Sequence, residues 1–366
     1  MHCKYCYYLE KGKFSTHLKQ TRMSFTLLER LIRQTIEGNP GPVVSFTWHG
    51  GEPTIAGLDF YKKVIEFEKK YLPRGWQAWN NLQTNGLLIN DSWAKFLKEN
   101  SFDVGISIDG DELVHNSNRL DISGHVTYGA VRTSVYKLKK VGIQPDLLCT
   151  VNSVTVRHSL DVYKSLRELD TGWIQFVPIV IRLPDGSYAP ETVMPGDYGN
   201  FLCAVFDEWI KSDLGKLDVQ LFAETSRILA GGKPSVCWMN KTCGRVLVVE
   251  EDGSIYSCDH FVDDEHRLGN LASSRLSTLA SNQIQAIFGN SKKALLIQEC
   301  KSCPYLNLCG GGCLKDRFNE ESGQYFLCSG MKKFFSHAVP VLNEAIKLSI
   351  DGMNAEEIKS RLSRNL

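Results

Sequence analysis

Hydrophobic and polar positions alternate along the first half of the chain in the manner typical of strand–helix repeats. Between residues 23 and 181, short apolar runs are separated by amphipathic stretches whose apolar positions recur at helical spacing. The run 43–48 is mostly β-branched or aromatic, as in a strand that is buried on both faces. We therefore predict strands at 43–48, 77–82, 104–108, 146–151 and 174–179, and helices at 28–36, 59–71, 92–99, 128–140 and 159–169.

This alternation predicts an α/β fold built on a parallel sheet. With a first strand lost or shortened before Cys3, the pattern makes about six strand–helix units. A closed eight-stranded barrel usually needs about 250 residues, so a partial (β/α)6 barrel of the TIM type fits residues 1–181 better. Residues 182–232 are predicted to form a linker followed by helices. Short hairpin-like strands, glycines and cysteines predict a small second domain over 233–330, followed by helices at 331–366.

Composition and charge exclude several classes of function. Of the 366 residues, 43% are hydrophobic and 23% are charged, as in ordinary globular proteins. The 42 basic and 41 acidic side chains leave a net charge of +1, which offers no field for holding nucleic acid or an anionic membrane. No apolar run approaches the roughly 18 residues of a membrane span, and no secretory signal opens the chain. We therefore expect a cytoplasmic protein that binds neither nucleic acid nor membrane.

The cysteines carry most of the chemical information. The chain has twelve, and in a reducing cytosol clustered cysteines are metal ligands or catalytic groups more often than disulfides. Eight of them belong to the second domain, at positions 237, 243, 258, 300, 303, 309, 313 and 328. Eight thiolates suffice for two closed sites, each a four-iron cluster or a tetrahedral zinc, and their spacing does not choose the metal. Cys149 and Cys203 are isolated, and we expect both to be core residues.

Glycine-containing and polar motifs follow the predicted strands. Gly50-Gly51-Glu52-Pro53 follows the first strand, Gln83-Thr84-Asn85-Gly86 the second, and Ser107 with Asp109-Gly110 the third. The C-terminal ends of parallel strands meet at one mouth, where the active sites of such folds lie. Glycines there allow the backbone to approach a ligand closely. Arg119 comes twelve residues after Ser107, and a guanidinium can hold a carboxylate through two parallel hydrogen bonds.

Together with these motifs, the N-terminal segment Cys3-Lys4-Tyr5-Cys6 resembles the cluster loop of radical S-adenosylmethionine (SAM) enzymes. In that superfamily a Cys-x3-Cys-x2-Cys loop holds a four-iron cluster whose open iron binds SAM. The resemblance implies that Cys3 and Cys6 bind iron. It also implies that Gly50, Gly51 and Glu52 bind the methionyl amino group of SAM, and that Ser107 and Arg119 bind the carboxylate of SAM. The remaining cysteine of the loop belongs four positions before Cys3, ahead of Met1. We therefore expect either a longer gene product or a chain that holds its catalytic cluster poorly.

The second domain resembles that of one group within the superfamily, the anaerobic sulfatase-maturating enzymes. The resemblance rests on Cys237-x5-Cys243, Tyr256-Ser257-Cys258-Asp259-His260, Arg267-Leu268-Gly269-Asn270 and the closing Cys-x2-Cys-x5-Cys-x3-Cys run. In that group the C-terminal region is of the SPASM type and carries two auxiliary four-iron clusters with interleaved ligands. The resemblance implies that Cys237, Cys243, Cys258 and Cys313 hold one cluster, and that Cys300, Cys303, Cys309 and Cys328 hold the other.

The resemblance also implies which groups act on the substrate. The family aspartate that matches Asp259 is the general base that removes the substrate's thiol or hydroxyl proton, a role that requires hydrogen-bond reach and little water. The alternative is that Asp259 is a turn residue. Tyr8 matches a tyrosine near the target side chain, with aromatic packing as its alternative role. His49 stands where relatives often carry glutamine and is a candidate substrate contact.

The implied reaction is the oxidation of a Cys or Ser in an unfolded sulfatase polypeptide to Cα-formylglycine. The implied cofactors are SAM and three 4Fe-4S clusters, one of the radical SAM type and two auxiliary, with electrons from a flavodoxin or ferredoxin type donor. Two alternatives stay open: another SPASM peptide maturase that forms thioether or carbon–carbon crosslinks, and a non-catalytic scaffold that binds zinc. Iron and sulfide in equal amounts after anaerobic reconstitution would exclude the zinc scaffold.

Overall fold

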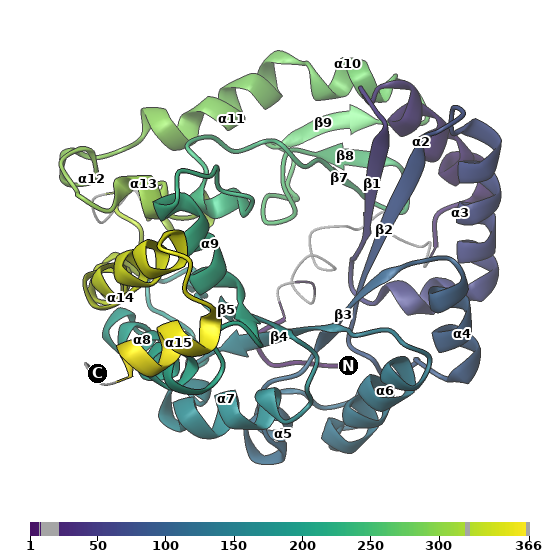
Figure 1. The fold of residues 1–366 in the computed structure, drawn as a ribbon. Helices are drawn as coiled ribbons and strands as arrows, with labels where there is room; N and C mark the ends of the chain where they lie inside the picture. The colour runs from purple at the N-terminus through teal and green to yellow at the C-terminus, as the bar shows by residue number, and fades with distance from the viewer. Residues whose placement is uncertain (7, 9–21, 319–322, 364–366) are drawn as a thin grey trace.

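A parallel sheet forms the first part of the molecule. In the computed structural model, which describes residues 1–6, 8, 22–318 and 323–363, six strands pair in the order β1-β2-β3-β4-β5-β6. The strands are β1 (Val43–Trp48), β2 (Gln77–Thr84), β3 (Asp103–Ser107), β4 (Asp146–Val151), β5 (Trp173–Pro178) and β6 (Asp218–Val219). The pairs from β1 to β5 are parallel, so the C-terminal ends of these strands lie at one edge of the sheet (Figure 1).

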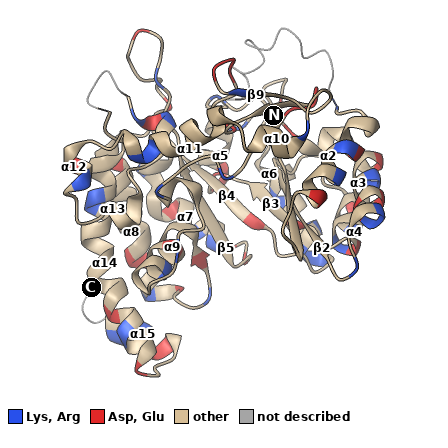
Figure 2. Ribbon diagram, turned by 90° about the horizontal axis from the view of Figure 1, so that it is seen from above, with Lys and Arg blue, Asp and Glu red and all other residues tan. Residues whose placement is uncertain are grey.

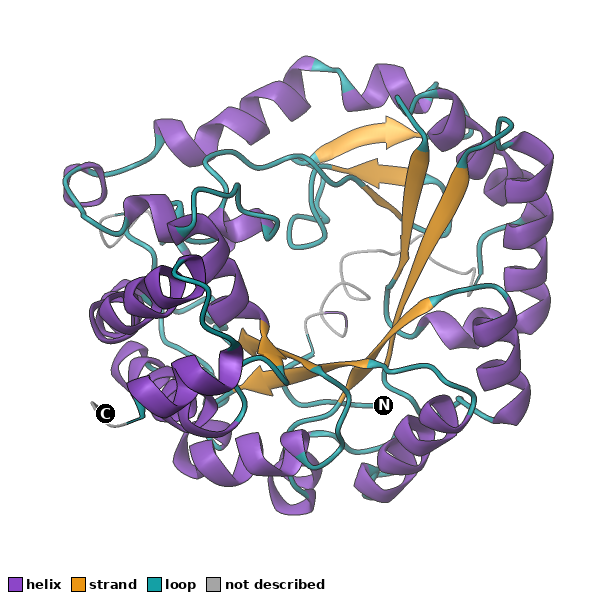
Figure 3. Cartoon of the chain, viewed as in Figure 1, coloured by secondary structure: helices purple, strands orange, loops and turns teal. Residues whose placement is uncertain are grey.

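Helices lie around the outside of the strands (Figure 3). They are α2 (Phe25–Glu37), α3 (Leu58–Tyr71), α4 (Asp91–Glu99), α5 (Glu112–Asn118), α6 (Tyr128–Lys140), α7 (Ser159–Arg167), α8 (Pro195–Ser212) and α9 (Gln220–Leu229). Two 3-10 helices, η1 (Pro53–Ala56) and η2 (Thr155–His158), follow β1 and β4. The amphipathic pattern explains their packing: α2, for example, buries Leu28, Ile32 and Ile36, which lie on one helical face.

The predicted α/β class is confirmed, and each predicted strand and helix of residues 23–181 is present. We expect a first strand to be lost or shortened before Cys3, and residues 1–6 contain no strand; the His2 N–H donates to the Leu120 carbonyl at 2.8 Å. The prediction for residues 182–232 is corrected. The sixth strand is β6, which pairs with β5 and lies inside the segment 182–232 that we predict as a linker and helices. A strand of two residues carries no periodic signal.

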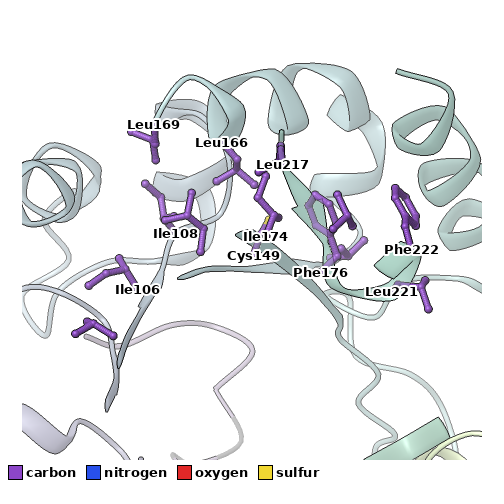
Figure 4. Packing of buried hydrophobic residues seen from close by; sticks show 14 of the residues in the cluster. Ile106, Ile108, Cys149, Leu166, Leu169, Ile174, Phe176, Leu217, Leu221 and Phe222 are labelled. Atoms are coloured by element: carbon purple, nitrogen blue, oxygen red, sulfur yellow. The ribbon is translucent and has the colours of Figure 1, made fainter. Parts of the chain in front are cut away.

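The core lies between the sheet and these helices (Figure 4). Ile106 and Ile108 from β3 and the following loop, Cys149 from β4 and Ile174 from β5 are fully buried. Cys149 behaves as the small buried hydrophobe predicted for it, whereas Cys203 is only half-buried on α8. This rigid core fixes the strand ends that carry the candidate site.

The second part of the chain packs against the first part in two places, at α2 and at α8 and α9 (Figure 1). It contains the antiparallel strands β7 (Val248–Val249), β8 (Ser254–Tyr256) and β9 (Arg267–Asn270), and the short helix η3 (Cys237–Met239). Its helices are α10 (Leu276–Ala280), α11 (Gln283–Ala294), α12 (Gln298–Lys301), α13 (Leu306–Cys309), η4 (Leu314–Asp316), α14 (Cys328–Ile350) and α15 (Ala355–Leu362). Leu27 and Leu31 of α2 pack against β7–β9, while Phe334 of α14 packs against Phe206 and Phe222 of α8 and α9.

Charged residues of both signs alternate along α2, α3 and α4 (Figure 2), in keeping with the net charge of +1. Exposed ion pairs such as Lys63–Glu66 join neighbouring turns of these helices. Within the described part of the chain, no helix combines the length and the apolar character needed to cross a bilayer.

Candidate functional site

The candidate site lies at the edge of the sheet where the strands end. β1 ends at Trp48 and is followed by His49, Gly50 and Gly51. Gly50 has a φ of +117°, which favours glycine, and a Cβ atom at Gly50 or Gly51 would meet no atom of the described residues within 4 Å. None of the described residues fills the space over this turn, which allows a ligand to approach the backbone.

The Glu52 carboxylate ties this turn to the next strand. Its Oε1 accepts hydrogen bonds from the Thr54 hydroxyl, from the Thr54 N–H at 3.0 Å and from the Thr84 hydroxyl at 2.6 Å. Its Oε2 accepts one from the Asn85 N–H at 2.8 Å, just after the end of β2. Glu52 thus meets four protein donors, and the structure shows it fixing the Gly50-Gly51 turn in place.

A buried ion pair follows β3. The Asp109 carboxylate is fully buried, and its Oδ2 lies 2.8 Å from Nε of Arg119, which is 5% exposed. The Tyr5 hydroxyl donates to the same oxygen, and Thr150 donates from its N–H and its hydroxyl, each at 2.8 Å. The guanidinium also lies 5.5 Å from the centre of the Tyr5 ring. Asp109 therefore connects the Cys3–Cys6 segment, the loop after β3 and the end of β4.

Electrostatics keep this pair charged. Burial acts to raise the pKa of Asp109, but the Arg119 guanidinium outweighs burial and holds that pKa below its usual value. Burial acts to lower the pKa of Arg119, and the charge of Asp109 reverses this effect. Burial raises the pKa of the Cys3 thiol, although Arg119 opposes the shift. A permanent positive charge beside Cys3 favours the thiolate form that binds metals.

The structure brings together the two residues predicted to contact the substrate. Tyr8 Oη lies 2.8 Å from Nδ1 of His49, and the two ring centres are 5.6 Å apart. Ser107, at the end of β3, accepts a hydrogen bond from Nε2 of Gln83 at 3.1 Å. Cys6 is half-buried, and its N–H donates to the Cys3 carbonyl at 3.0 Å. The predicted residues of the first domain thus gather at the C-terminal edge of the sheet.

Four cysteines of the second part line one cavity. Its volume is about 400 Å³, including the open space at its mouth, and its lining contains the thiols of residues 300, 303, 309 and 328. All four are free thiols, from α12, the following turn, α13 and the start of α14. The predicted ligands of one auxiliary cluster therefore surround a common space.

The other four predicted ligands also lie near one another. Burial raises the pKa of Cys258, and the charges of Asp259 and Cys313 raise it further. The Cys237 thiol adds to the burial that raises the pKa values of Cys243 and Cys313. Asp259 accepts a hydrogen bond from Sγ of Cys258 at 3.2 Å. In the parts of the chain that the structure describes, no three His, Cys, Asp or Glu side chains lie close enough to hold a single metal ion.

Sequence reasoning missed three buried groups near these sites. In the sequence Asp109 stands out only as part of a strand-end motif, although in the structure it pairs with Arg119. Lys292 and Arg317 are 0% and 8% exposed and lie beside the cysteines. Lys292 stands within Ser291-Lys292-Lys293, which has the composition of an ordinary exposed helix face, so its burial has no local signal.

Comparison with known families supports both parts of this description. Residues 1–167 match the family model of the radical SAM superfamily. Residues 237–304 match the model of an iron–sulfur cluster-binding domain, SPASM.

Curated relatives extend the similarity to nearly the whole chain. A serine-type anaerobic sulfatase-maturating enzyme of Bacteroides thetaiotaomicron is 39% identical, over 93% of this chain and 87% of the relative. A cysteine-type enzyme of the same description from Clostridium perfringens is 36% identical, over 93% of each chain. The solved structure described as native anSMEcpe with bound AdoMet and Cp18Cys peptide has a TM-score of 0.86 at 35% identity, covering 96% of this chain and 95% of that one. Streptococcus suis SuiB with its precursor peptide, at 15% identity and a TM-score of 0.60, shares the fold.

Proposed function

This chain belongs to the anaerobic sulfatase-maturating enzymes, and we propose that it oxidises a Cys or Ser residue of an unfolded sulfatase polypeptide to Cα-formylglycine. The observation that carries the proposal is the interleaved grouping of cysteines. Cys309 shares a cavity with Cys300 and Cys328, whereas Cys313, only four residues later, neighbours Cys258. The two groups of four thiols fit two auxiliary clusters, and the glycine turn after β1 fits a SAM site.

The eight cysteines of the second part fit the two auxiliary clusters of the family. Cys3 and Cys6 supply two of the three thiolates that the radical cluster needs. Cys237, Cys243, Cys258 and Cys313 hold one auxiliary cluster, and Cys300, Cys303, Cys309 and Cys328 hold the other. Thiolates are the ligands that iron–sulfur clusters take. When bound, SAM and the radical cluster would supply the radical that removes one hydrogen atom, and the auxiliary clusters would accept the one electron that remains after Asp259 takes the proton.

The strand ends bind and orient SAM. Arg119 and Ser107 bind its carboxylate, and Asp109 keeps the guanidinium charged and in position. Because the Glu52 carboxylate already meets four protein donors, the carbonyls of Gly50 and Gly51 accept most of the hydrogen bonds from the methionyl ammonium. Glu52 contributes its negative charge and holds the turn.

Asp259 takes the proton from the substrate's thiol or hydroxyl. Its position next to Cys258 fixes its backbone once that cysteine is bound, and general-base catalysis depends on such fixed geometry. Tyr8 and His49, which hydrogen-bond one another, contact the target side chain. A flavodoxin or ferredoxin type protein supplies the electron, because a low-potential cluster needs a low-potential one-electron carrier.

An anaerobic assay on paired peptides tests this function. Two sulfatase-like peptides that differ only by Cys or Ser at the target position are incubated with SAM and a reductant, and an aldehyde-specific hydrazine reagent detects formylglycine. The family loop has a cysteine four positions before the one that matches Cys3, so the assay compares this chain with a variant extended at its N-terminus to supply that cysteine. We expect aldehyde from at least one peptide with the extended chain. SAM cleavage without aldehyde would contradict the proposal, and a crosslinked peptide would favour another maturase.

The Asp259→Asn variant of the same extended chain tests whether Asp259 is the general base. Asparagine keeps the size of the side chain and loses the carboxylate, so SAM cleavage should continue while aldehyde formation falls at least about 100-fold. Aldehyde formation at the unsubstituted rate would remove Asp259 from the mechanism and leave it as a turn residue.

A further inference from the structure

Two buried cations lie between the two groups of cysteines. Lys292, on α11, is 0% exposed, and its Nζ donates to the carbonyls of Trp238 at 2.6 Å, Asn240 at 2.5 Å and Cys237 at 3.4 Å. These three carbonyls belong to the turn that carries Cys237. One ammonium group thus holds the whole backbone turn of a proposed cluster ligand.

Arg317 holds the backbone next to the other group of cysteines in the same way. Its Nε donates to the Gly311 carbonyl at 2.7 Å and its Nη2 to the Gly310 carbonyl at 3.2 Å, directly after Cys309. Its Nη1 donates to the carbonyl of Lys292 at 2.7 Å. The two cations are therefore joined through one backbone carbonyl, and each holds the segment next to a cysteine of a different group.

The glycines between Cys309 and Cys313 make this junction tight. A Cβ atom at Gly310 would lie 2.6 Å from the Met239 carbonyl oxygen, and one at Gly311 would lie 2.3 Å from Nη2 of Arg317. The chain that passes from one cysteine group to the other is thus packed directly against the turn that Lys292 holds.

The charge of the two cations has no carboxylate to balance it in the described part of the chain. No ion pair joins Lys292 or Arg317 to a described Asp or Glu, and Asp316, next to Arg317 in the sequence, pairs with Lys315 at 2.6 Å. Thiols of both groups act on Arg317: burial lowers its pKa, and Cys300 and Cys243 oppose the shift. A buried charge without a counter-charge is costly. Clusters bound by four thiolates are anionic, so they supply the missing negative charge.

We propose that Lys292 and Arg317 are positioning residues that hold the ligands of the two auxiliary clusters at a fixed spacing and raise the reduction potentials of both clusters. Reduction adds negative charge, and a nearby buried positive charge stabilises the reduced form. This inference rests on the cluster ligands assigned under the proposed function. It adds the residues that tune those clusters for accepting an electron from the substrate.

Redox titration of the reconstituted full chain tests the proposal, with Lys292→Met and Arg317→Met as the variants. Lys293→Met is the matched control, since it removes the same charge from the exposed neighbouring position on α11. Iron and sulfide content are measured first, and the cluster signals are then followed by electron paramagnetic resonance. We expect Lys292→Met to move the potential of the Cys237 group further negative, Arg317→Met to act more on the Cys300 group, and Lys293→Met to leave both unchanged.

Potentials equal to those of the unsubstituted chain, at full iron content, would overturn the proposal. Where Lys292→Met binds too little iron to titrate, Lys292→Gln retains one donor without the charge. A negative shift in Lys292→Gln supports the role of the charge, and an unchanged potential overturns it. If a reconstituted variant lacks iron in one group while its apo-protein unfolds at the normal temperature, the positioning role is supported. A general fall in the unfolding temperature of the apo-protein overturns it. If the unsubstituted chain binds no iron through these cysteines, the proposed function itself fails.

Discussion

At the scale of single residues, the arrangement around Asp109 shows why a buried charge must be considered with its partner. Arg119 is almost completely buried, and Asp109 is the carboxylate beside it. We predict that Asp109→Asn lowers the free energy of unfolding by about 3–5 kcal/mol, because it leaves a buried guanidinium unpaired. Urea unfolding of the apo-protein, followed by circular dichroism, measures this change.

The double variant Asp109→Asn/Arg119→Met distinguishes the cost of breaking the ion pair from other losses of stability. If the cost of Asp109→Asn comes from the unpaired guanidinium, then removing both charges should cost less than the sum of the two single changes. Additive costs would show that Asp109 acts through Tyr5 and Thr150 instead.

At the scale of elements, a buried carboxyl group with a raised pKa lies where α3 packs on β2. Glu68 of α3 is 4% exposed and accepts hydrogen bonds from Nδ2 of Asn80 on β2 at 3.0 and 3.1 Å. Burial raises the pKa of Glu68 to about 7, although the Asn80 hydrogen bond opposes the shift. In the unfolded chain this pKa is about 4.3. The folded protein therefore binds the proton more tightly than the unfolded chain does.

We predict that the free energy of unfolding falls by about 3 kcal/mol as pH rises from about 4 to about 7 and levels off above 7, since the folded state must then ionise a buried carboxyl group. Urea unfolding across this range measures the slope. Glu68→Gln resembles the protonated form, so it should remove that part of the pH dependence and be the more stable protein at pH 8. Glu66→Gln, on the exposed face of the same helix, is the control and should retain the slope. Equal slopes in all three proteins would contradict the raised pKa.

The elements also show what the sequence can and cannot predict. Periodicity identified the strands β1 to β5 and most of the helices between them. The expectation that β1 is buried on both faces is wrong, because its buried residues alternate with exposed ones. Periodicity missed β6, which is too short for a period, and α5, where Asp111 caps the helix through the Val114 N–H at 2.9 Å. Motif spacing named the cysteines, yet the burial of Lys292 depends on carbonyls 52 to 55 residues away. Contacts between residues so far apart in the sequence leave no pattern in the residues around Lys292.

At the scale of the whole molecule, the second part of the chain is docked onto α2. Arg30 donates from Nη1 to the Ala272 carbonyl at 2.8 Å and from Nη2 to the Ser274 carbonyl at 3.3 Å. Gln34 Oε1 accepts from the Leu276 N–H at 2.7 Å. These contacts follow directly on β9, whose neighbour β8 leads into Cys258 and Asp259. The docking on α2 therefore sets the position of the proposed base relative to the mouth of the sheet.

We predict that Arg30→Ala/Gln34→Ala uncouples SAM cleavage from substrate oxidation. The strand ends that bind SAM are untouched, so cleavage should continue, while a misplaced Asp259 removes the substrate proton less often; a misplacement of about 1 Å can cost about 100-fold. The ratio of 5′-deoxyadenosine to formylglycine, measured in the extended chain, should therefore rise. Arg33→Ala is the control, because Arg33 lies on the same helix and pairs only with Glu37 at 3.8 Å among the described residues. A ratio unchanged from that of the control would show that the packing of Leu27 and Leu31 holds the second part in place without these hydrogen bonds.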